Sequence, residues 1–213
     1  MPIEIEIPLF PLNAVLFPYS KLPLFIFEER YKMMINECFD NETCFGINFF
    51  NERKMNLTGC TALIDEVVNR LDKGEMNIVI KGVQIYKIVN YELSLHGFYT
   101  GKIEYLYEEN LDFDKAKMEK CVKIYNDLVE LVYKGTIKKI DLNDMKWYDG
   151  KRSVAFSIAE KSGLSLLERQ NLLEVDLEDK RLDLILKYFE EVIPKLKDAD
   201  RISSIIKSDG YIQ

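Results

Sequence analysis

The strongest constraint on this chain is an apolar and aromatic stretch, residues 7–31, which is interrupted by Pro8, Pro11, Pro18 and Pro23. It reads IPLFPLNAVLFPYSKLPLFIFEERY. A membrane-spanning helix needs about 20 consecutive apolar residues, and each proline inside a helix removes a backbone hydrogen bond. A secretory signal begins with cationic residues, whereas this chain begins MPIEIE. We therefore expect a soluble, cytoplasmic protein with no membrane partner, in which this stretch belongs to the folded core.

The composition is that of an ordinary globular protein with a mild acidic bias. The 213 residues are 47% hydrophobic and 31% charged. That is enough for one large domain or two small ones with a core that needs no disulfide or metal. The formal net charge is -7. A sequence-independent nucleic-acid binder normally carries a basic surface, so nucleic acid is not the expected partner.

The cysteines and the single histidine do not form a metal motif. The cysteines are Cys38, Cys44, Cys60 and Cys121, and no two of them form a C-x-x-C pair. The histidine, His96, is distant from all of them in sequence, and zinc sites usually show close Cys/His pairs. We predict buried, reduced thiols, a surface histidine, and no metal or other cofactor.

The first half of the chain has the pattern of strands. Short runs rich in β-branched and aromatic residues occupy residues 4–7, 44–50, 59–68, 76–82, 83–92 and 98–107. LDKGE at residues 71–75 predicts a turn, Gly82 ends or bulges its strand, and Val83, Ile85 and Ile88 are candidate inward residues. A single helix is expected from Glu28 to Cys38. Its apolar face would comprise Tyr31, Met34, Ile35 and Cys38. This half is predicted to be a compact, mostly antiparallel barrel or sandwich.

The prolines of the opening stretch fit such a barrel if they lie at strand ends and edges, where no ladder N–H is required. Pro8 and Pro11 would end the first strand and shape a crossing loop. Pro18 would turn the chain, and Pro23 would start or edge the second strand before the helix begins.

The second half has the pattern of helices. Apolar spacing predicts a helix over residues 114–133, which Lys134-Gly135 would end, followed by a polar loop at 136–150. A short helix is expected at 153–161, a capping box at Ser165 and Glu168, and a longer helix capped by Asp176. Pro194 would kink or end this helix, and a last amphipathic piece would cover residues 200–207. Most aromatic residues precede residue 108 and most charged residues follow it, so we predict two subdomains, residues 1–110 and 111–213.

No catalytic constellation emerges from the residue types. A Rossmann glycine pattern and a phosphate-binding loop are absent from the sequence, and no G-x-S-x-G elbow accompanies His96. Ser157 and Lys161 are four apart on a predicted helix and would share one face, but Lys161 lies at the helix end, where solvent keeps a lysine protonated. Arg30 is interpreted as a structural partner of a carboxylate, and Trp147 as an anchor of the polar loop. The pattern favours a non-enzymatic binding or adaptor module.

The opening stretch also resembles the start of the amino-terminal, substrate-binding domain of the Lon ATP-dependent proteases. In that family an apolar strand is followed by L-F-P-L-x-x-V-L-F-P and then by a leucine-rich strand that leads into F-E-x-R-Y. The matching residues are Leu9, Phe10, Pro11, Leu12, Val15, Leu16, Phe17, Pro18, Leu22, Pro23, Leu24, Phe27, Glu28, Arg30 and Tyr31. Weaker similarity continues through residues 45–47 and 58–67 and the helical segment 164–192. The chain departs from the family at Lys73-Gly74-Glu75, where D-G-R is usual, and at Ile85, where the family has arginine.

The resemblance implies an α+β fold: a PUA-like, mostly antiparallel β pseudo-barrel with one early helix, followed by a carboxy-terminal helical bundle. It also implies a stand-alone substrate-binding-domain protein, since the ATPase and Ser-Lys peptidase modules of Lon proteases are not found in this sequence. No enzyme activity and no cofactor are expected.

The expected function is binding of unfolded or peptide-like protein segments, or adapting them to another machine such as a protease or chaperone. An RNA-binding module is the alternative, because PUA-like barrels often serve RNA enzymes. A small-molecule pocket or weak hydrolase and plain oligomerisation are further alternatives. Candidate peptide contacts are Phe17, Tyr19 and Phe25, although each is interpreted first as a core residue.

Overall fold

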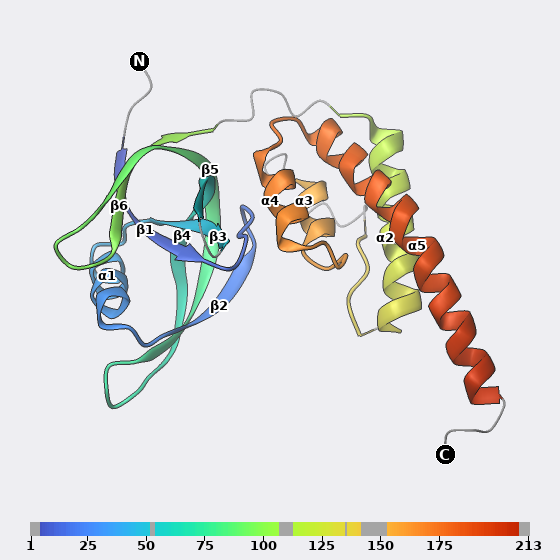
Figure 1. The fold of residues 1–213 in the computed structure, drawn as a ribbon, viewed down its shortest axis with the longest axis horizontal. Coiled ribbons are helices and arrows are strands. Elements are labelled where there is room, and N and C mark those ends of the chain that lie inside the picture. The colour runs from blue at the N-terminus through green and yellow to red at the C-terminus, as the bar shows by residue number, and fades with distance from the viewer. Residues whose placement is uncertain (1–4, 52–53, 107–112, 135, 142–152, 209–213) are drawn as a thin grey trace. The chain divides into compact units, whose positions relative to one another are not determined.

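The computed structural model describes residues 5–51, 54–106, 113–134, 136–141 and 153–208 (Figure 1). Contacts divide the chain into two units. The first, which we call the sheet unit, joins residues 1–109 with residues 165–176, and the second, the helical unit, joins residues 110–164 with residues 177–213. Residues 165–176 thus group with the sheet, although the boundary predicted near residue 110 assigned them to the helical half. The independence of the two subdomains stays a prediction.

The sheet unit is a six-stranded sheet that closes on itself through one long strand. Its order is β2-β5-β4-β3-β1-β6, with a further pairing between β5 and β6. The first part of β5, up to Lys81, pairs with β2, whereas its later part, from Tyr86, pairs with β6. Strands β5, β4, β3, β1 and β6 therefore form a ring, and β2 is attached to it by one edge. The strands are β1 (Ile5–Leu12), β2 (Lys21–Ile26), β3 (Phe45–Asn51), β4 (Lys54–Arg70), β5 (Met76–Leu93) and β6 (Tyr99–Tyr105).

The prediction that Pro8 and Pro11 end the first strand is wrong, because both residues lie inside β1. Residues 5–9 of β1 pair with β6, and residues 9–12 pair in parallel with β3. Each half of β1 therefore carries a ladder on one side, and a proline is tolerated where the strand has a free side. The change of partner at Leu9 explains how one strand holds both prolines.

The helix α1 (Glu29–Asp40) confirms the predicted apolar face, because Tyr31, Met34, Ile35 and Cys38 are all buried. They pack into a large core with inward residues of β2, β3, β4 and β5. A second, smaller core includes Leu9, Tyr86, Ile88 and Ile103. Of the residues predicted to face inward on β5, Ile85 and Ile88 are buried, but Val83 is 37% exposed. Val83 points outward because it follows the inward-facing Gly82, and strand side chains alternate.

Gly82 does not end its strand, because β5 continues through it to Leu93. The register between β4 and β5 shifts between Gly82 and Ile85, in agreement with the predicted bulge. The turn Phe17–Ser20 packs directly against this glycine, and the Tyr19 N–H donates to the Gly82 carbonyl at 2.8 Å. A Cβ atom on Gly82 would lie 2.1 Å from the Phe17 carbonyl oxygen. Pro18 occupies the second position of this turn, as predicted, and Tyr19 the third with φ 65, a conformation that favours glycine. A close backbone approach therefore requires glycine at residue 82.

The Gly82→Ala variant tests this contact. Because the added methyl group meets backbone rather than a movable side chain, we expect a loss of about 1–3 kcal/mol in the free energy of unfolding. Urea denaturation, monitored by far-ultraviolet circular dichroism, measures this free energy of unfolding. The neighbouring Val83→Ala, which truncates a partly exposed side chain, is the control and should cost less than the glycine variant. Equal, small effects of both variants would contradict the packing argument.

The described helices of the helical unit are α2 (Lys115–Tyr133), α3 (Val154–Ala159) and α5 (Glu178–Ser208), while α4 (Leu166–Glu174) belongs to the sheet unit. The predicted capping box at Ser165 and Glu168 is present at the start of α4. Gln170 on α4 donates from Nε2 to the Thr58 carbonyl of β4 at 3.1 Å, which holds α4 on the sheet. None of the described helices combines the length and apolarity needed to cross a bilayer.

Two helix-end predictions in the second half differ from the structure, and one is confirmed. Pro194 does not end its helix, because α5 continues through it to Ser208 without a second helix. Asp176 does not lie directly before α5, since that helix begins at Glu178. The predicted stop after residue 133 is confirmed, because α2 ends at Tyr133 and its C-cap is Lys134 with φ 47, while Gly135 lies outside the described residues.

A buried carboxylate joins the starts of α3 and α5. Glu178 accepts hydrogen bonds from the Ser153 hydroxyl at 2.6 Å and from the Ala155 N–H at 2.9 Å. Arg181, which is 1% exposed, lies 3.4 Å from the same carboxylate and stacks over the Phe156 ring. Because a buried charge is stable only when it is paired and hydrogen-bonded, these contacts determine how α3 and α5 meet.

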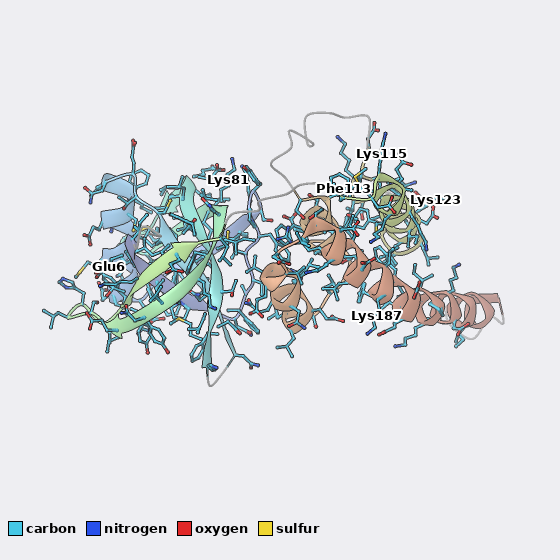
Figure 2. The ribbon with its side chains drawn as sticks, turned by 90° about the horizontal axis from the view of Figure 1, so that it is seen from above. Glu6, Lys81, Phe113, Lys115, Lys123 and Lys187 are labelled. Atoms are coloured by element: carbon cyan, nitrogen blue, oxygen red, sulfur yellow. The ribbon has the colours of Figure 1, made fainter. Side chains whose placement is uncertain are left out.

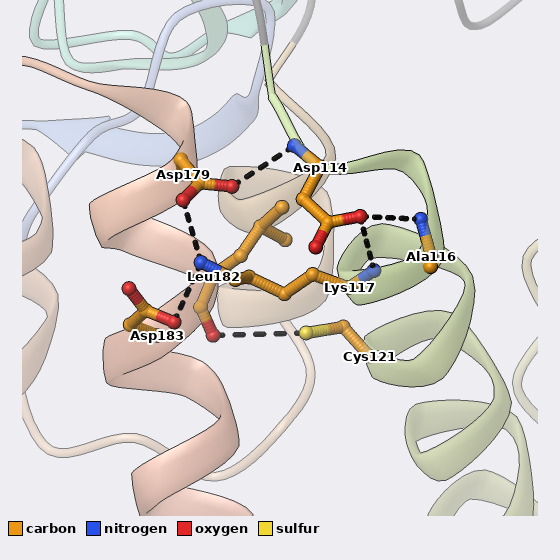
Figure 3. Close-up of polar contacts among 7 residues, drawn as sticks. All are labelled: Asp114, Ala116, Lys117, Cys121, Asp179, Leu182 and Asp183. Atoms are coloured by element: carbon orange, nitrogen blue, oxygen red, sulfur yellow. Dashed lines mark hydrogen bonds and ion pairs between the residues drawn. The ribbon is translucent and has the colours of Figure 1, made fainter.

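Lys117 of α2 links this helix to α5 through two ion pairs, which we call the Lys117 clasp (Figure 3). The Lys117 ammonium lies 2.5 Å from Asp179 and 2.8 Å from Asp183, and Asp179 also accepts from the Asp114 N–H. Asp114 caps α2 by accepting from the N–H groups of Ala116 and Lys117. The hydrogen bond from Lys117 lowers the pKa of Asp179 below its usual value of 3.8.

This clasp predicts an acid-dependent loss of stability in Asp179→Asn. A carboxylate whose pKa is lower in the folded state stabilises the fold above its ordinary pKa, and that contribution disappears as the pH falls through the lower, folded value. The melting temperature of the variant should therefore lie below that of the parent protein at neutral pH, and the gap should close as the pH falls below about 3.8. The exposed Asp127→Asn is the control, for which no pH-dependent gap is expected. A gap that stays constant down to acidic pH would contradict the assignment.

Candidate functional site

The structure does not assemble the serine–lysine pair considered from the sequence. The Ser157 hydroxyl donates to the Ser153 carbonyl at 3.1 Å, and α3 ends at Ala159, two residues before Lys161. The two residues therefore do not share a helix, contrary to the prediction. Lys161 is exposed, as expected.

The thiols and the histidine lie where a catalytic or metal role is not supported. All four cysteines are free, and Cys38, Cys60 and Cys121 are buried, as predicted, while Cys44 is half-buried. Burial raises the pKa of Cys38 to about 11 and that of Cys60 and Cys121 to about 12. Because the thiolate is the reactive form, these thiols are inert at neutral pH. His96 is exposed, as predicted, and stacks on Phe98.

A pocket of about 310 Å³ lies on the outer, polar face of β1, β5 and β6. Its lining combines carboxylates, an amide, a hydroxyl and one lysine, without a histidine, serine or cysteine that could act as a nucleophile or base. The lining residues are Glu6, Asn90, Tyr91, Glu92, Thr100, Gly101 and Lys102. Within the described residues, no cluster of His, Cys, Asp and Glu could hold a metal ion. The pocket therefore offers polar and charged contacts to a ligand.

The three candidate contacts predicted from the sequence differ in their accessibility. Phe17 is 1% exposed and belongs to the core. Tyr19 is half-buried in the turn that packs on Gly82. Phe25 is 49% exposed on the outer face of β2. Phe25 is therefore the candidate whose side chain is free to meet a partner.

Phe25 belongs to an apolar stripe on the outer face of β2, which we call the β2 stripe and define as Pro23, Phe25 and Phe27. The rings of Phe25 and Phe27 stack with centroids 5.8 Å apart, and Phe27 is 57% exposed. Pro23 is also exposed. Alternation of strand residues predicts that positions 23, 25 and 27 share a face, but the sequence does not show that this face lacks a covering element.

Polar contacts fix the chain directly after the β2 stripe. Arg30 donates to Glu28 at 2.8 Å and to the Gly97 carbonyl at 3.1 Å, and its guanidinium lies 4.5 Å from the centre of the Tyr31 ring. The predicted carboxylate partner of Arg30 is thus Glu28, although both side chains are partly exposed rather than buried. These contacts hold the end of β2 and the start of α1 and leave the rings of the stripe exposed.

A second exposed apolar surface lies on the β5–β6 hairpin. Leu93 is 61% exposed, and Leu95 in the turn is fully exposed. Tyr91 is 44% exposed and meets Tyr99 edge to face. This surface was not singled out from the sequence, where Leu93 and Leu95 resemble core positions of a strand. Trp147, which was expected to anchor the polar loop, lies outside the described residues.

Comparison with known proteins finds a matching family model and several similar proteins. Residues 6–191 match the family model described as the ATP-dependent protease La (LON) substrate-binding domain. The Lon protease of Escherichia coli K12 is 26% identical over 216 residues, covering 96% of this chain and 27% of the relative. The Lon protease of Erwinia amylovora is 25% identical with the same coverage. The chain therefore spans about a quarter of the length of these curated relatives.

Two solved structures show the same fold. A Lon N-terminal domain protein from Xanthomonas campestris is similar with a TM-score of 0.70 and 20% identity, covering 86% of this chain and 98% of that chain. The N-terminal domain of the Mycobacterium avium complex Lon protease has a TM-score of 0.70 and 15% identity, covering 87% of this chain and 98% of that chain. The predicted α+β fold class is confirmed.

Truncation of Phe17 should lower the stability of the fold much more than truncation of Phe25. Phe17→Ala removes a buried ring and should cost about 3–5 kcal/mol of unfolding free energy, as large core truncations do. Phe25→Ser removes a half-exposed ring from an edge strand and should change stability by less than about 1 kcal/mol. Chemical denaturation of both variants measures the difference. A large loss in Phe25→Ser would show that this ring stabilises the fold rather than remaining available to a partner.

Proposed function

This chain belongs to the family of Lon substrate-binding domains, and from that premise we propose that it binds unfolded or peptide-like protein segments in the cytoplasm, without catalysing a reaction on them. The observation that carries the proposal is the β2 stripe, in which two stacked phenylalanine rings are each about half exposed. Exposed aromatic side chains gathered on one surface are typical of protein interaction sites.

The size of the β2 stripe fits weak to moderate binding of short segments. Full burial of one phenylalanine side chain contributes about 1.5–3 kcal/mol. Burial of two half-exposed rings therefore contributes about as much binding free energy as burial of one fully exposed ring. Since about 1.4 kcal/mol corresponds to a tenfold change in Kd, we expect the pair to strengthen binding at least tenfold.

An adaptor role is the form of this function that suits a chain matching the substrate-binding part of its relatives. The family match ends at residue 191 and concerns substrate binding alone. We propose that a bound segment is passed to a partner machine, such as a protease or chaperone, which performs the chemistry.

RNA binding, the alternative considered from the sequence, has less support around the β2 stripe. Several basic side chains there already form ion pairs: Lys21 with Asp65, Arg30 with Glu28, and Lys32 with Glu29. RNA binding depends on cations that are free to neutralise phosphates. Paired cations contribute little to that interaction, so a protein segment is the better-supported ligand.

Fluorescence anisotropy with a labelled, permanently unfolded protein, such as reduced and alkylated lysozyme, tests the proposal. We expect saturable binding by the parent protein and a loss of affinity of about tenfold or more in the Phe25→Ser/Phe27→Ser variant. Leu95→Ser is the matched control, because it removes an exposed apolar side chain from another surface; its affinity should stay within about twofold.

Absence of binding at high micromolar protein, or an unchanged affinity in the double variant, would contradict this assignment. Tight, salt-sensitive binding of a structured RNA instead would favour the alternative. Release of acid-soluble fragments from the unfolded protein, abolished by Ser157→Ala, would contradict the non-enzymatic role.

A further inference from the structure

We propose that the bound segment adds as an extra strand to the edge of β2 that no other described strand pairs, and that this edge selects a continuous apolar run. This inference rests on the proposed function and specifies the mode of binding and the class of segment.

The backbone of β2 has a free edge with known polarity. In the sheet order β2 is the terminal strand, and its pairing with β5 runs without a register shift from Lys21 to Ile26. The Ser20 carbonyl accepts from the Gly82 N–H on the β5 side. Because successive residues of a strand alternate the direction of their backbone groups, Lys21, Pro23 and Phe25 direct theirs away from β5. Their carbonyls and the N–H groups of Lys21 and Phe25 are therefore positioned to pair with a further strand.

Pro23 lies at the centre of this free edge and limits the ladder without preventing it. Proline lacks an N–H, so one hydrogen bond of an added strand is missing at that position, while the Pro23 carbonyl still accepts. Proline on an edge strand also opposes indiscriminate edge-to-edge pairing between copies. The backbone alone therefore offers few hydrogen bonds, and side-chain burial has to supply the remaining affinity.

Both faces of β2 would gain burial from an added strand. On the outer face the β2 stripe is exposed. On the inner face Leu22 and Leu24 pack on the large core yet remain partly exposed, whereas Ile26 is 1% exposed. A strand that is apolar on alternate residues would cover one face and place polar groups against the other. A strand buried on both faces is apolar throughout, so the edge favours a continuous run about as long as β2, which has 6 residues.

The charges beside the start of β2 balance one another. Lys81, which Figure 2 labels, lies opposite Lys21 in the pairing of β5 with β2. Lys21 forms an ion pair with Asp65 at 2.6 Å, and the charges of Glu66 and Lys81 also act on this pair. Two lysines therefore meet two carboxylates there, so these charges give no preference for the flanks of an added segment.

The direction of the added strand follows from the stability of the ladder. An antiparallel strand pairs somewhat more stably per residue than a parallel one. We therefore expect the segment to run antiparallel to β2, from Ile26 toward Lys21.

Four fluorescent peptides test this mode on the parent protein. The first carries two lysines, a run of Val, Phe, Leu, Val and Phe, and two glutamates. The second has the same residues in an order that interrupts the apolar run with the charged residues. The third and fourth are the first with backbone N-methyl groups on alternate residues of the run, one peptide for each of the two registers. We expect the first peptide to bind about tenfold more tightly than the second, and about tenfold more tightly than the methylated peptide whose methyl groups face β2.

Equal binding of the N-methylated and parent peptides in both registers of methylation would overturn strand addition. If that peptide binding is still lost in Phe25→Ser/Phe27→Ser, the proposed function survives while this inference fails.

Discussion

The sheet unit depends on the length of one strand, because β5 is the neighbour of three others. Its first part holds β2 and its later part holds β6, while β4 runs along both. The ring closes through this exchange of neighbours, and Gly82 lies between the two parts, where the Phe17–Ser20 turn meets the backbone. The same geometry leaves β2 paired on one side. A single long strand thus creates both the closed core and the open edge.

Local sequence patterns predicted the elements of this fold better than their connections. The face of α1 followed from apolar spacing alone, and the capping box at Ser165 followed from residue types that satisfy each other's backbone groups. Pro8 and Pro11 were misassigned because a proline is excluded only where both sides of a strand are paired. Which side of β1 is paired depends on β3 and β6, which lie far along the chain. Pro194 was expected to kink or end its helix, and the ending is contradicted because α5 continues through it to Ser208.

The candidate site was predictable in composition but not in exposure. The sequence places aromatic residues throughout residues 7–31, and the choice among Phe17, Tyr19 and Phe25 could not be made from periodicity. Phe17 is covered, whereas Phe25 on the terminal strand β2 is half exposed. Phe27 was noted as a family residue and not as a contact. Exposure is a property of the assembled sheet, and the linear pattern does not contain it.

The groups that could perform chemistry are already engaged in holding the fold. Burial raises the pKa of the thiols of Cys38, Cys60 and Cys121 and so disfavours the thiolate form. The Ser157 hydroxyl donates a hydrogen bond to a backbone carbonyl. At the edge of β2 the situation is reversed, since backbone donors and acceptors point away from β5 and aromatic rings remain half exposed. Surfaces with unpaired backbone groups and exposed apolar side chains bind extended chains. The distribution of engaged and exposed groups among the described residues therefore supports the proposal of binding at the edge of β2.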